Sequence, residues 1–324
     1  MVTPFFSVVI PTYNRSGLLK EAVHSIMDQS FEDFELLIVD DHSTDDTKNV
    51  VASFKDSRIK YISNDRTKGG AGTRNAGIFR AKGRWVAFLD DDDVWLSNKL
   101  ELQYKKIQEV DSAVGLVYSG SAGYDFAGKR VISEHIPEKE GWIQKDLLYK
   151  NYIGTFSRLV IRNDILKKVG GLDERFEAVQ DWELCVRIAG TCKIAFIKEI
   201  FTYSRLSNKD RITLTPEKKL KSLLLFWQKY EHLIKGNFRL RYHFATQVFV
   251  FAFKQRDMRH ILRALPWTFV GLFFDIENVS LVFGTIYYQF VRNPPPSAFR
   301  ISSRKNRIRH SHLHLGEVDT GELK

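Results

Sequence analysis

Residues 7–41 read SVVIPTYNRSGLLKEAVHSIMDQSFEDFELLIVDD, and this stretch decides the class of fold. Two apolar runs of strand length, SVVIP and FELLIVD, flank a segment, SGLLKEAVHSIMDQ, whose apolar residues recur at helical spacing. A strand, a helix and a second strand in this order are typical of a unit in which both strands run parallel in one sheet. We therefore expect an α/β fold.

The same alternation continues to about residue 109. The segments TDDTKNVVASF, IKYI, AGTRNAGIFRA and WVAFLD follow in turn, so short apolar runs keep alternating with helical segments. This pattern predicts a mostly parallel central sheet flanked by helices. Asp40 and Asp90 each end a predicted strand, at the edge of the sheet where open α/β proteins bind their ligands.

The composition of the chain changes beyond Thr215 to Phe, Leu, Lys and Arg at helical spacing. Three apolar runs follow, at 244–253, 265–274 and 279–291. A helix that crosses a bilayer needs ~20 predominantly apolar residues, so we expect residues 213–296 to form a helical extension that lies partly in a membrane interface. Core helices are the alternative. Residues 297–324 are basic and are expected to be a disordered tail.

Charge is distributed unevenly along the 324 residues, which carry a net charge of +10. Residues 1–210 hold 30 Lys and Arg against 31 Asp and Glu, whereas residues 211–324 hold 19 against 8, so the positive excess lies in the last third. A basic block of this kind favours contact with an anionic lipid surface or a nucleic acid, and a simply solvated face is the alternative. With only Cys185 and Cys192 and no leader pattern, we expect reduced thiols and a cytoplasmic location.

The strongest local signal for chemistry is FLDDDDVW at residues 88–95, where Asp90, Asp91, Asp92 and Asp93 follow a buried strand. Adjacent carboxylates repel one another, and at a strand end they are costly unless a cation neutralises them. Magnesium and manganese take oxygen ligands and commonly join one or two carboxylates to substrate phosphates. We therefore expect a Mg²⁺ or Mn²⁺ site, against the alternative of a loop that only caps the next helix.

Two further motifs suit a nucleotide. In IVDDHSTDDT, either Asp40 or Asp41 is placed to accept a hydrogen bond from a base or a ribose, although such residues also form ordinary turns. The segment KGGAGTRNAG combines glycines, a helix start and Arg74, which suits a diphosphate. It follows the third strand and lacks the G-x-G-x-x-G spacing, so it is not a dinucleotide-binding fingerprint.

Five motifs in this order resemble glycosyltransferase family 2, whose members have the GT-A fold. They are SVVIPTYNR at 7–15, VDDHSTD at 39–45, GGAGTRN at 69–75, FLDDDDVW at 88–95 and QDWELCVR at 180–187. The resemblance implies that residues 1–115 form a nucleotide-sugar-binding half and residues 116–212 an acceptor-binding half of one domain. It does not extend past about residue 215.

The resemblance also assigns roles to individual residues. It implies that Asp181 is the catalytic base and that Asp92 binds the metal. The remaining matches are donor-binding residues: Pro11, Thr12 and Tyr13 beside the nucleotide, Asp40 and Asp41 at the base, Arg74 in the basic motif, Asp90 near the ribose as the partner of Asp92 in an Asp-x-Asp element, and Asp91 between them. The chain departs from the family pattern at Gln180, where Glu is common, and at Leu206, where many members have a His that contacts the metal.

These assignments fit the demands of sugar transfer. A proton acceptor and a source of positive charge must lie on opposite sides of the anomeric carbon, and Asp181 on one side with Asp92 and Arg74 on the other would supply them. Asp181 could instead only cap its helix. We expect an inverting, metal-dependent glycosyltransferase with a UDP-type donor and a glycan or polyprenyl-linked acceptor, peripheral to the inner face of the cell membrane.

Two other functions fit the same residues less well. A sugar nucleotidyltransferase would favour a glycine-rich, basic phosphate loop directly after the first strand, and PTYNRSG has little glycine. A non-catalytic nucleotide-sugar or nucleic-acid binder would have no need of both Asp92 and Asp181. Nucleic acid is therefore not the expected partner.

Overall fold

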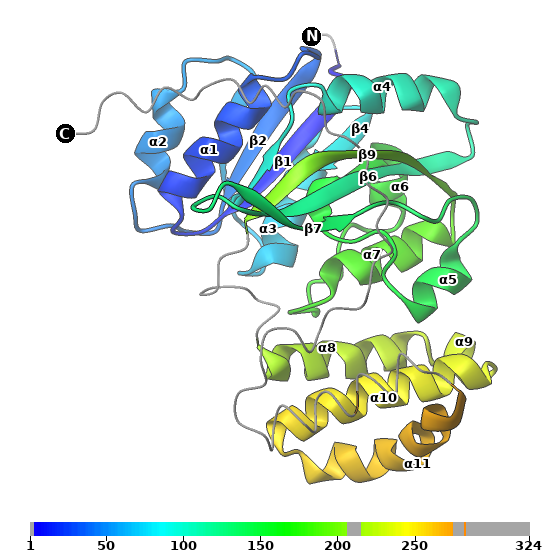
Figure 1. Cartoon of the computed structure of the whole chain (residues 1–324). Coiled ribbons are helices and arrows are strands. Elements are labelled where there is room, and N and C mark those ends of the chain that lie inside the picture. The colour runs from blue at the N-terminus through cyan, green and yellow to red at the C-terminus, as the bar shows by residue number, and fades with distance from the viewer. Residues whose placement is uncertain (1–2, 206–214, 275–281, 283–324) are drawn as a thin grey trace.

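The computed structural model describes residues 3–205, 215–274 and 282, and within them nine strands form one sheet (Figure 1). The strand order is β3-β2-β1-β4-β8-β6-β9-β5, with β7 paired to β6. The strands are β1 (Phe6–Thr12), β2 (Phe34–Asp40), β3 (Ile59–Ser63), β4 (Trp85–Phe88), β5 (Asp93–Trp95), β6 (Val114–Asp125), β7 (Arg130–His135), β8 (Leu159–Arg162) and β9 (Lys193–Arg205).

Helices cover both faces of the sheet and form a further layer beside it (Figure 1). Those of the first 205 residues are α1 (Ser16–Met27), α2 (Thr47–Ser53), α3 (Gly70–Arg80), α4 (Lys99–Glu109), α5 (Gln144–Tyr149), α6 (Asn163–Lys168) and α7 (Gln180–Ala189). The further layer contains α8 (Pro216–Lys229), α9 (Glu231–Lys235), α10 (Phe238–Gln255) and α11 (Met258–Phe274).

The strands predicted from the first hundred residues pair as expected, because β1 lies between β2 and β4 and both pairings are parallel, as is β2 with β3. The second half of the chain adds antiparallel pairs of β8 with β4 and β6, of β7 with β6 and of β5 with β9, while β6 and β9 are parallel. The parallel description therefore holds for the first half, and the whole sheet is mixed.

Alternation along β1 explains why this strand is buried on both faces. Val8 and Ile10 enter one apolar cluster with α1, whereas Val9 enters the other with α3. The parallel register places Thr12 opposite Asp40, and Asp40 opposite Ser63, so the first three strands end together. This shared edge is where the acidic motifs collect.

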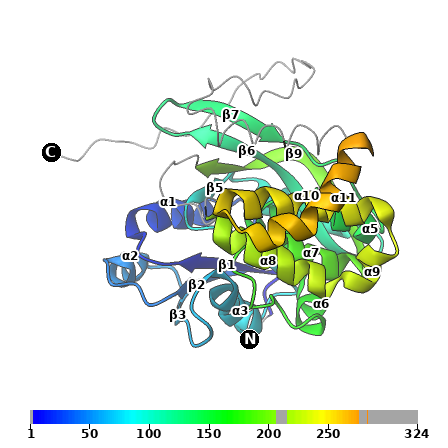
Figure 2. The same cartoon turned by 90° about the horizontal axis from the view of Figure 1, so that it is seen from below.

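One apolar core runs from the sheet into the helical layer. Trp182 of α7 lies with its ring centroid 4.8 Å from that of Phe226 on α8, and Phe226 lies 5.2 Å from Phe244 on α10. The same cluster contains Val9 of β1 and Ala264 of α11. In the view of Figure 2 the layer covers α7. The division at residues 212 and 213 thus stays a prediction about function, since apolar packing continues across it.

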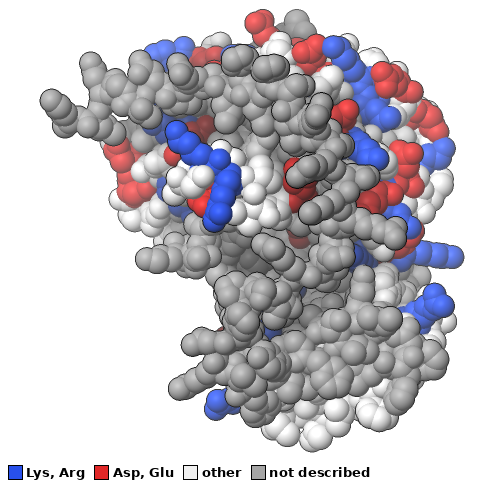
Figure 3. Space-filling model, in the orientation of Figure 1, with Lys and Arg blue, Asp and Glu red and all other residues white. Residues whose placement is uncertain are grey.

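None of the helices in the described parts of the chain combines the length and the apolar character that a bilayer crossing requires. Two of the three apolar runs, 244–253 and 265–274, lie in α10 and α11. Of the third run only Val282 is described, and it is buried in the core; the basic tail at 297–324 and Leu206 lie outside the described residues. On the face drawn in Figure 3, acidic and basic side chains are mixed over the sheet domain, in line with the near-neutral balance of residues 1–210.

Candidate active site

A cavity of about 550 Å³ opens at the carboxyl edge of the parallel strands. Loops after β1, β2 and β4 and the start of α3 form one side, and β6, β7 and β9 contribute to the other. Eight of the predicted site residues line it, namely Pro11, Thr12, Tyr13, Asp41, Arg74, Asp90, Asp91 and Asp92. Asp40 and Asp181 are not among its lining residues.

The acidic turn, defined as Asp90–Asp93, meets two arginines. Arg15 donates to Oδ1 of Asp91 at 3.1 Å and to Oδ2 of Asp92 at 3.2 Å, while Arg74 pairs with Asp90. Within the described part of the chain, these contacts bring two guanidinium groups to three of the four carboxyl groups of the turn.

Burial is the main cause of the unusual acidity of this turn. It raises the pKa of Asp91 to about 6, with Arg15 opposing the shift and the charges of Asp92 and Asp90 adding to it. Burial also raises the pKa of Asp93 well above its ordinary value, helped by Asp90 and Asp92. Buried carboxyl groups whose pKa is raised suit a ligand that brings positive charge.

Within the described residues, no three or more His, Cys, Asp and Glu side chains form a cluster that could hold a metal ion. A magnesium or manganese ion in a nucleotide site does not need such a cluster, because one or two carboxylates and the substrate phosphates complete its coordination. The donor set here fits that arrangement, since Asp92 and Asp91 offer hard carboxylate oxygens at the cavity wall.

Asp40 and Asp41, at the end of β2, lie in different surroundings. Asp40 is buried, and its carboxylate accepts hydrogen bonds from the Ser43 backbone N–H at 3.0 Å and from the Tyr61 hydroxyl. Asp41 accepts from the Gly69 N–H at 2.8 Å and from the Asn64 side chain at 2.7 Å. Only Asp41 lines the cavity, so the geometry favours Asp41 over Asp40 as the residue that meets the nucleotide.

Glycines shape the wall on which Arg74 lies. Gly69 has a φ of +112°, a conformation that L side chains rarely adopt, and a Cβ on Gly72 would lie 1.8 Å from the Thr67 carbonyl oxygen. The α3 helix can therefore begin close to the cavity. Its Arg74 lies over the Phe156 ring at 4.1 Å and donates to the carbonyl of Gly70 at 3.1 Å.

Asp181 is the second residue of α7, and its Oδ1 accepts from the Trp182 backbone N–H at 2.8 Å. The N-cap position of α7 belongs to Val179, so the capping alternative for Asp181 is wrong. Burial raises the pKa of Asp181; the Trp182 N–H and Lys219 oppose the shift, and the charge of Asp90 adds to it. Asp181 does not line the cavity, but its neighbour Gln180 contacts Arg74, which pairs with Asp90 of the acidic turn.

Gln180 links these two parts of the site. Its Oε1 accepts from Arg74 Nη1 at 3.4 Å, and its Nε2 donates to the Phe176 carbonyl at 2.8 Å. The departure from the family pattern at this position therefore places an amide, which is a neutral acceptor, beside the guanidinium of Arg74. The start of α7 contacts the cavity wall through this side chain.

Sequence reasoning missed a further group of residues that line the cavity. Arg15 lies within a motif that we quoted, but without a role. The others come from strands whose pairing no local pattern reveals: Ser121 and Gly123 on β6, Ser133 and His135 on β7, and Ser204 and Arg205 on β9.

A comparison with protein-family models matches residues 7–170 to Glycosyl transferase family 2. The chain belongs to this family. It is an enzyme of the glycosyltransferase class with the GT-A fold, and both of these expectations from the sequence are confirmed.

Curated relatives support the same membership. The GalNAc(5)-diNAcBac-PP-undecaprenol beta-1,3-glucosyltransferase of Campylobacter jejuni is 32% identical over 245 residues, which cover 73% of this chain and 76% of that protein. The Escherichia coli UDP-Glc:alpha-D-GlcNAc-diphosphoundecaprenol beta-1,3-glucosyltransferase WfgD is 44% identical over 97 residues, 30% of this chain and 38% of the relative. This chain therefore matches well under half of the length of WfgD.

Solved structures of similar fold extend further along the chain. S. aureus TarS in complex with UDP-GlcNAc matches with a TM-score of 0.60 at 18% identity, over 86% of this chain and 79% of that one. The mannosyltransferase PcManGT from Pyrobaculum calidifontis, in complex with GDP-Man and Mn²⁺, matches with a TM-score of 0.55 at 16% identity, over 90% and 82%. At these identities the likeness concerns the fold.

Proposed function

We propose that this family 2 glycosyltransferase moves a sugar from a nucleotide-diphosphate donor, with UDP favoured, to an acceptor hydroxyl with inversion at the anomeric carbon. One observation carries the proposal: the cavity collects Asp41, Arg74 and the acidic turn from separate segments of the chain onto one wall. The relative WfgD is named for UDP-Glc, and TarS is solved with UDP-GlcNAc, which supports the choice of donor.

Residues of the cavity wall bind the nucleotide-sugar donor. Pro11, Thr12 and Tyr13 form the loop beside the nucleotide, and Asp41 accepts a hydrogen bond from the base. Arg74 stabilises the negative charge that develops on the diphosphate as the bond to the sugar breaks. A Mg²⁺ or Mn²⁺ held by Asp92 would add positive charge at the same place.

The acceptor side falls to Asp181. The acceptor oxygen forms a bond to the anomeric carbon while the bond from that carbon to the diphosphate breaks, and the electron pair leaves with the diphosphate. Asp181 takes the proton of the acceptor hydroxyl in this step. Attack from the face opposite the leaving group inverts the configuration. Gln180 and Lys219 set the charge around Asp181, because one contacts Arg74 and the other attracts the carboxylate.

For the acceptor we propose a lipid-linked glycan at the inner face of the membrane. Both relatives described above are named for undecaprenol-linked acceptors. Helix α11 presents a row of exposed apolar side chains at helical spacing, and residues 238–274 contain six Lys or Arg against Asp257 alone. Such a face suits an anionic lipid surface. The row consists of Met258, Leu262, Leu265 and Phe269.

The membrane part of this proposal is tested by sedimentation of the full chain with liposomes. Binding to vesicles that contain anionic lipid, weakened by the double substitution Leu262→Glu and Phe269→Glu, is the expected result. Equal sedimentation of the wild type and the double variant, or no binding to either vesicle type, would contradict it.

The catalytic part is tested by release of nucleotide diphosphate from a panel of nucleotide sugars, with Mn²⁺ or Mg²⁺ and a polyprenyl-linked glycan. Asp181→Asn is expected to lower turnover by ~10²- to 10⁴-fold and to leave donor binding intact. Asp111→Asn, at an exposed surface pair with Lys193, is the matched control and retains activity. Full activity in Asp181→Asn would refute the base assignment.

The same assay separates the two alternative functions. A sugar nucleotidyltransferase would release inorganic pyrophosphate from a nucleoside triphosphate and a sugar phosphate. A non-catalytic binder would bind the donor and release nothing.

A further inference from the structure

We propose that helix α8 of the C-terminal extension is a positioning element of the active site, in which Lys229 and Tyr230 hold Glu183 and thereby fix the turn of α7 that carries Asp181. This inference rests on the proposed function, in which Asp181 takes the proton of the acceptor. It makes the extension part of the catalytic machinery in addition to any contact with a membrane.

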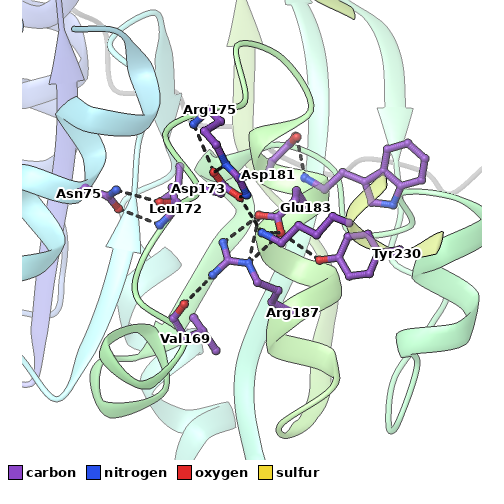
Figure 4. Close-up of polar contacts among 11 residues, drawn as sticks. Asn75, Val169, Leu172, Asp173, Arg175, Asp181, Glu183, Arg187 and Tyr230 are labelled. Carbon is purple, nitrogen blue, oxygen red and sulfur yellow. Dashed lines mark hydrogen bonds and ion pairs between the residues drawn. The ribbon is translucent and has the colours of Figure 1, made fainter. Parts of the chain in front are cut away.

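Glu183 is the centre of this arrangement, which Figure 4 shows. It lies two residues after Asp181 on α7, and its side chain is only 1% exposed. Its Oε1 accepts from the Tyr230 hydroxyl at 2.9 Å and pairs with Lys229 Nζ at 2.8 Å, while its Oε2 accepts from Arg187 Nη2 at 2.8 Å. Both oxygens are therefore occupied, by one group from α7 itself and by two from the end of α8.

Glu183 is the acceptor of the cluster, and Tyr230 is one of its donors. Burial opposes the ionisation of Glu183, but hydrogen bonds from Arg187 and Lys229 outweigh it, and the pKa of Glu183 lies below its ordinary value. Burial raises the pKa of Tyr230, and the neighbouring Glu183 raises it further, so the hydroxyl keeps its proton and remains a donor. The contact of α8 with α7 is thus a permanent hydrogen-bonded ion cluster.

A second set of contacts holds the loop that leads into α7. Lys229 also pairs with Asp173 at 2.7 Å, and Ser222 Oγ of α8 accepts from the Ala178 backbone N–H at 3.0 Å. The next residue, Val179, has a φ of +54°, which is a strained conformation for a β-branched side chain. The backbone just before Asp181 is therefore held in an unfavourable conformation by contacts from α8.

Apolar packing also joins the two helices, because the rings of Trp182 and Phe226 lie 33° from parallel at 4.8 Å. A buried ion cluster adds little net stability compared with apolar residues of the same shape, but it specifies one register. Because Glu183 lies less than one turn from Asp181 on α7, a fixed register of α7 against α8 also fixes the position of Asp181.

The cavity side completes the restraint. Gln180 contacts Arg74 in the cavity wall, and α8 contacts the other side of the same turn through Glu183 and Ala178. Asp181 lies between these two restraints. A misplacement of a catalytic group by 1 Å can cost ~10²-fold in rate. Loss of the α8 contacts therefore lowers turnover by displacing Asp181, even though no residue of the cluster touches the substrate.

The test compares variants of the full chain. Lys229→Met removes the shared cation, Tyr230→Phe removes one hydrogen bond with little change in shape, and Lys229→Arg restores the charge. Lys235→Met, in an exposed pair with Glu231 on the neighbouring helix α9, is the matched control. Lys229→Met is expected to lower kcat of transfer about ten- to hundredfold, with KM for the donor within twofold, and Tyr230→Phe to have a smaller effect of the same kind. Lys229→Arg recovers most of the rate, and Lys235→Met matches the wild type.

A second measurement needs no turnover. Hydrogen exchange of the amides of residues 178–184 is expected to accelerate in Lys229→Met and Tyr230→Phe, while exchange in β1 and β2 stays unchanged. Unchanged exchange in both variants would overturn the inference, whatever the activity. So would a fall in donor affinity and thermal stability that accounts for the whole loss of rate. A wild-type chain that released no nucleotide diphosphate with any donor would instead refute the proposed function and leave the exchange result to stand on its own.

Discussion

The acidic turn and the Glu183 cluster both concentrate buried carboxylates, and the protein treats them in opposite ways. In the turn, two arginines contact three of the four carboxyl groups, and burial raises the pKa of Asp91 to about 6. In the cluster, Arg187 and Lys229 surround Glu183 and hold its pKa below the ordinary value. The carboxylate that fixes a helix thus has a lowered pKa beside two cations, whereas a carboxyl group at the cavity has a raised pKa, which suits a ligand that brings positive charge.

The largest expected effect is the loss of stability when the Glu183 cluster is broken. Glu183→Gln leaves Arg187 without its anion and Lys229 with Asp173 alone, which costs about 3–5 kcal/mol of the free energy of unfolding. Urea denaturation measures it. A loss below 1 kcal/mol would show that the cluster is hydrated and does not differ from a surface pair.

Asp92→Asn is expected to show the opposite pattern. Turnover falls by ~10²-fold, equivalent to about 3 kcal/mol of transition-state stabilisation, because Asp92 is the residue that we propose to hold the metal. Stability does not fall, since a negative charge leaves a repulsive turn. Release of nucleotide diphosphate at increasing Mn²⁺ measures the turnover of the variant, and thermal denaturation in EDTA measures its stability. If Asp92→Asn lost as much stability as Glu183→Gln, the acidic turn and the Glu183 cluster would not differ in the way described.

The pH dependence of stability should have opposite signs in the two regions. The raised pKa of Asp91 means that the folded chain binds more protons than the unfolded chain between pH ~4 and ~6, so this group makes stability fall by about 2–3 kcal/mol as pH rises through that window. The lowered pKa of Glu183 contributes stability that is present at neutral pH and is lost as pH falls below its ordinary value of 4.5. Urea denaturation from pH 4 to 7 in EDTA should show a flatter profile for Asp91→Asn, and an identical profile would contradict the assignment.

The smallest expected effect concerns a second lysine of α8. Lys221 pairs with Glu177 at 2.5 Å, but its side chain is 67% exposed. Lys221→Met should therefore change the free energy of unfolding by less than about 1 kcal/mol and leave kcat unchanged. A loss comparable with that of Lys229→Met would mean that position on α8, and not burial, decides which lysine matters.

The donor half of the site was predictable because its residues follow strands that the apolar pattern reveals. Once β1, β2 and β4 are recognised as parallel neighbours, Thr12, Asp41 and Asp90 must lie at one edge. The Glu183 cluster was not predictable, since Glu183 and Tyr230 are 47 residues apart and each looks like an ordinary helix residue. His135 and Ser133 line the cavity because β7 pairs antiparallel with β6, and no pattern in the sequence predicts that pairing.

The continuous core between the sheet domain and the helical layer also bears on how related genes can exchange parts. A recombination junction between β9 and α8 would separate Trp182 from Phe226 and Glu183 from Lys229, so the foreign helix would meet a face shaped for another partner. A junction ahead of α5 keeps these pairs in one inherited segment but divides β4 from β8, and β6 from β8 and β9. Chimeras of such enzymes should therefore lose native pairings at either crossover.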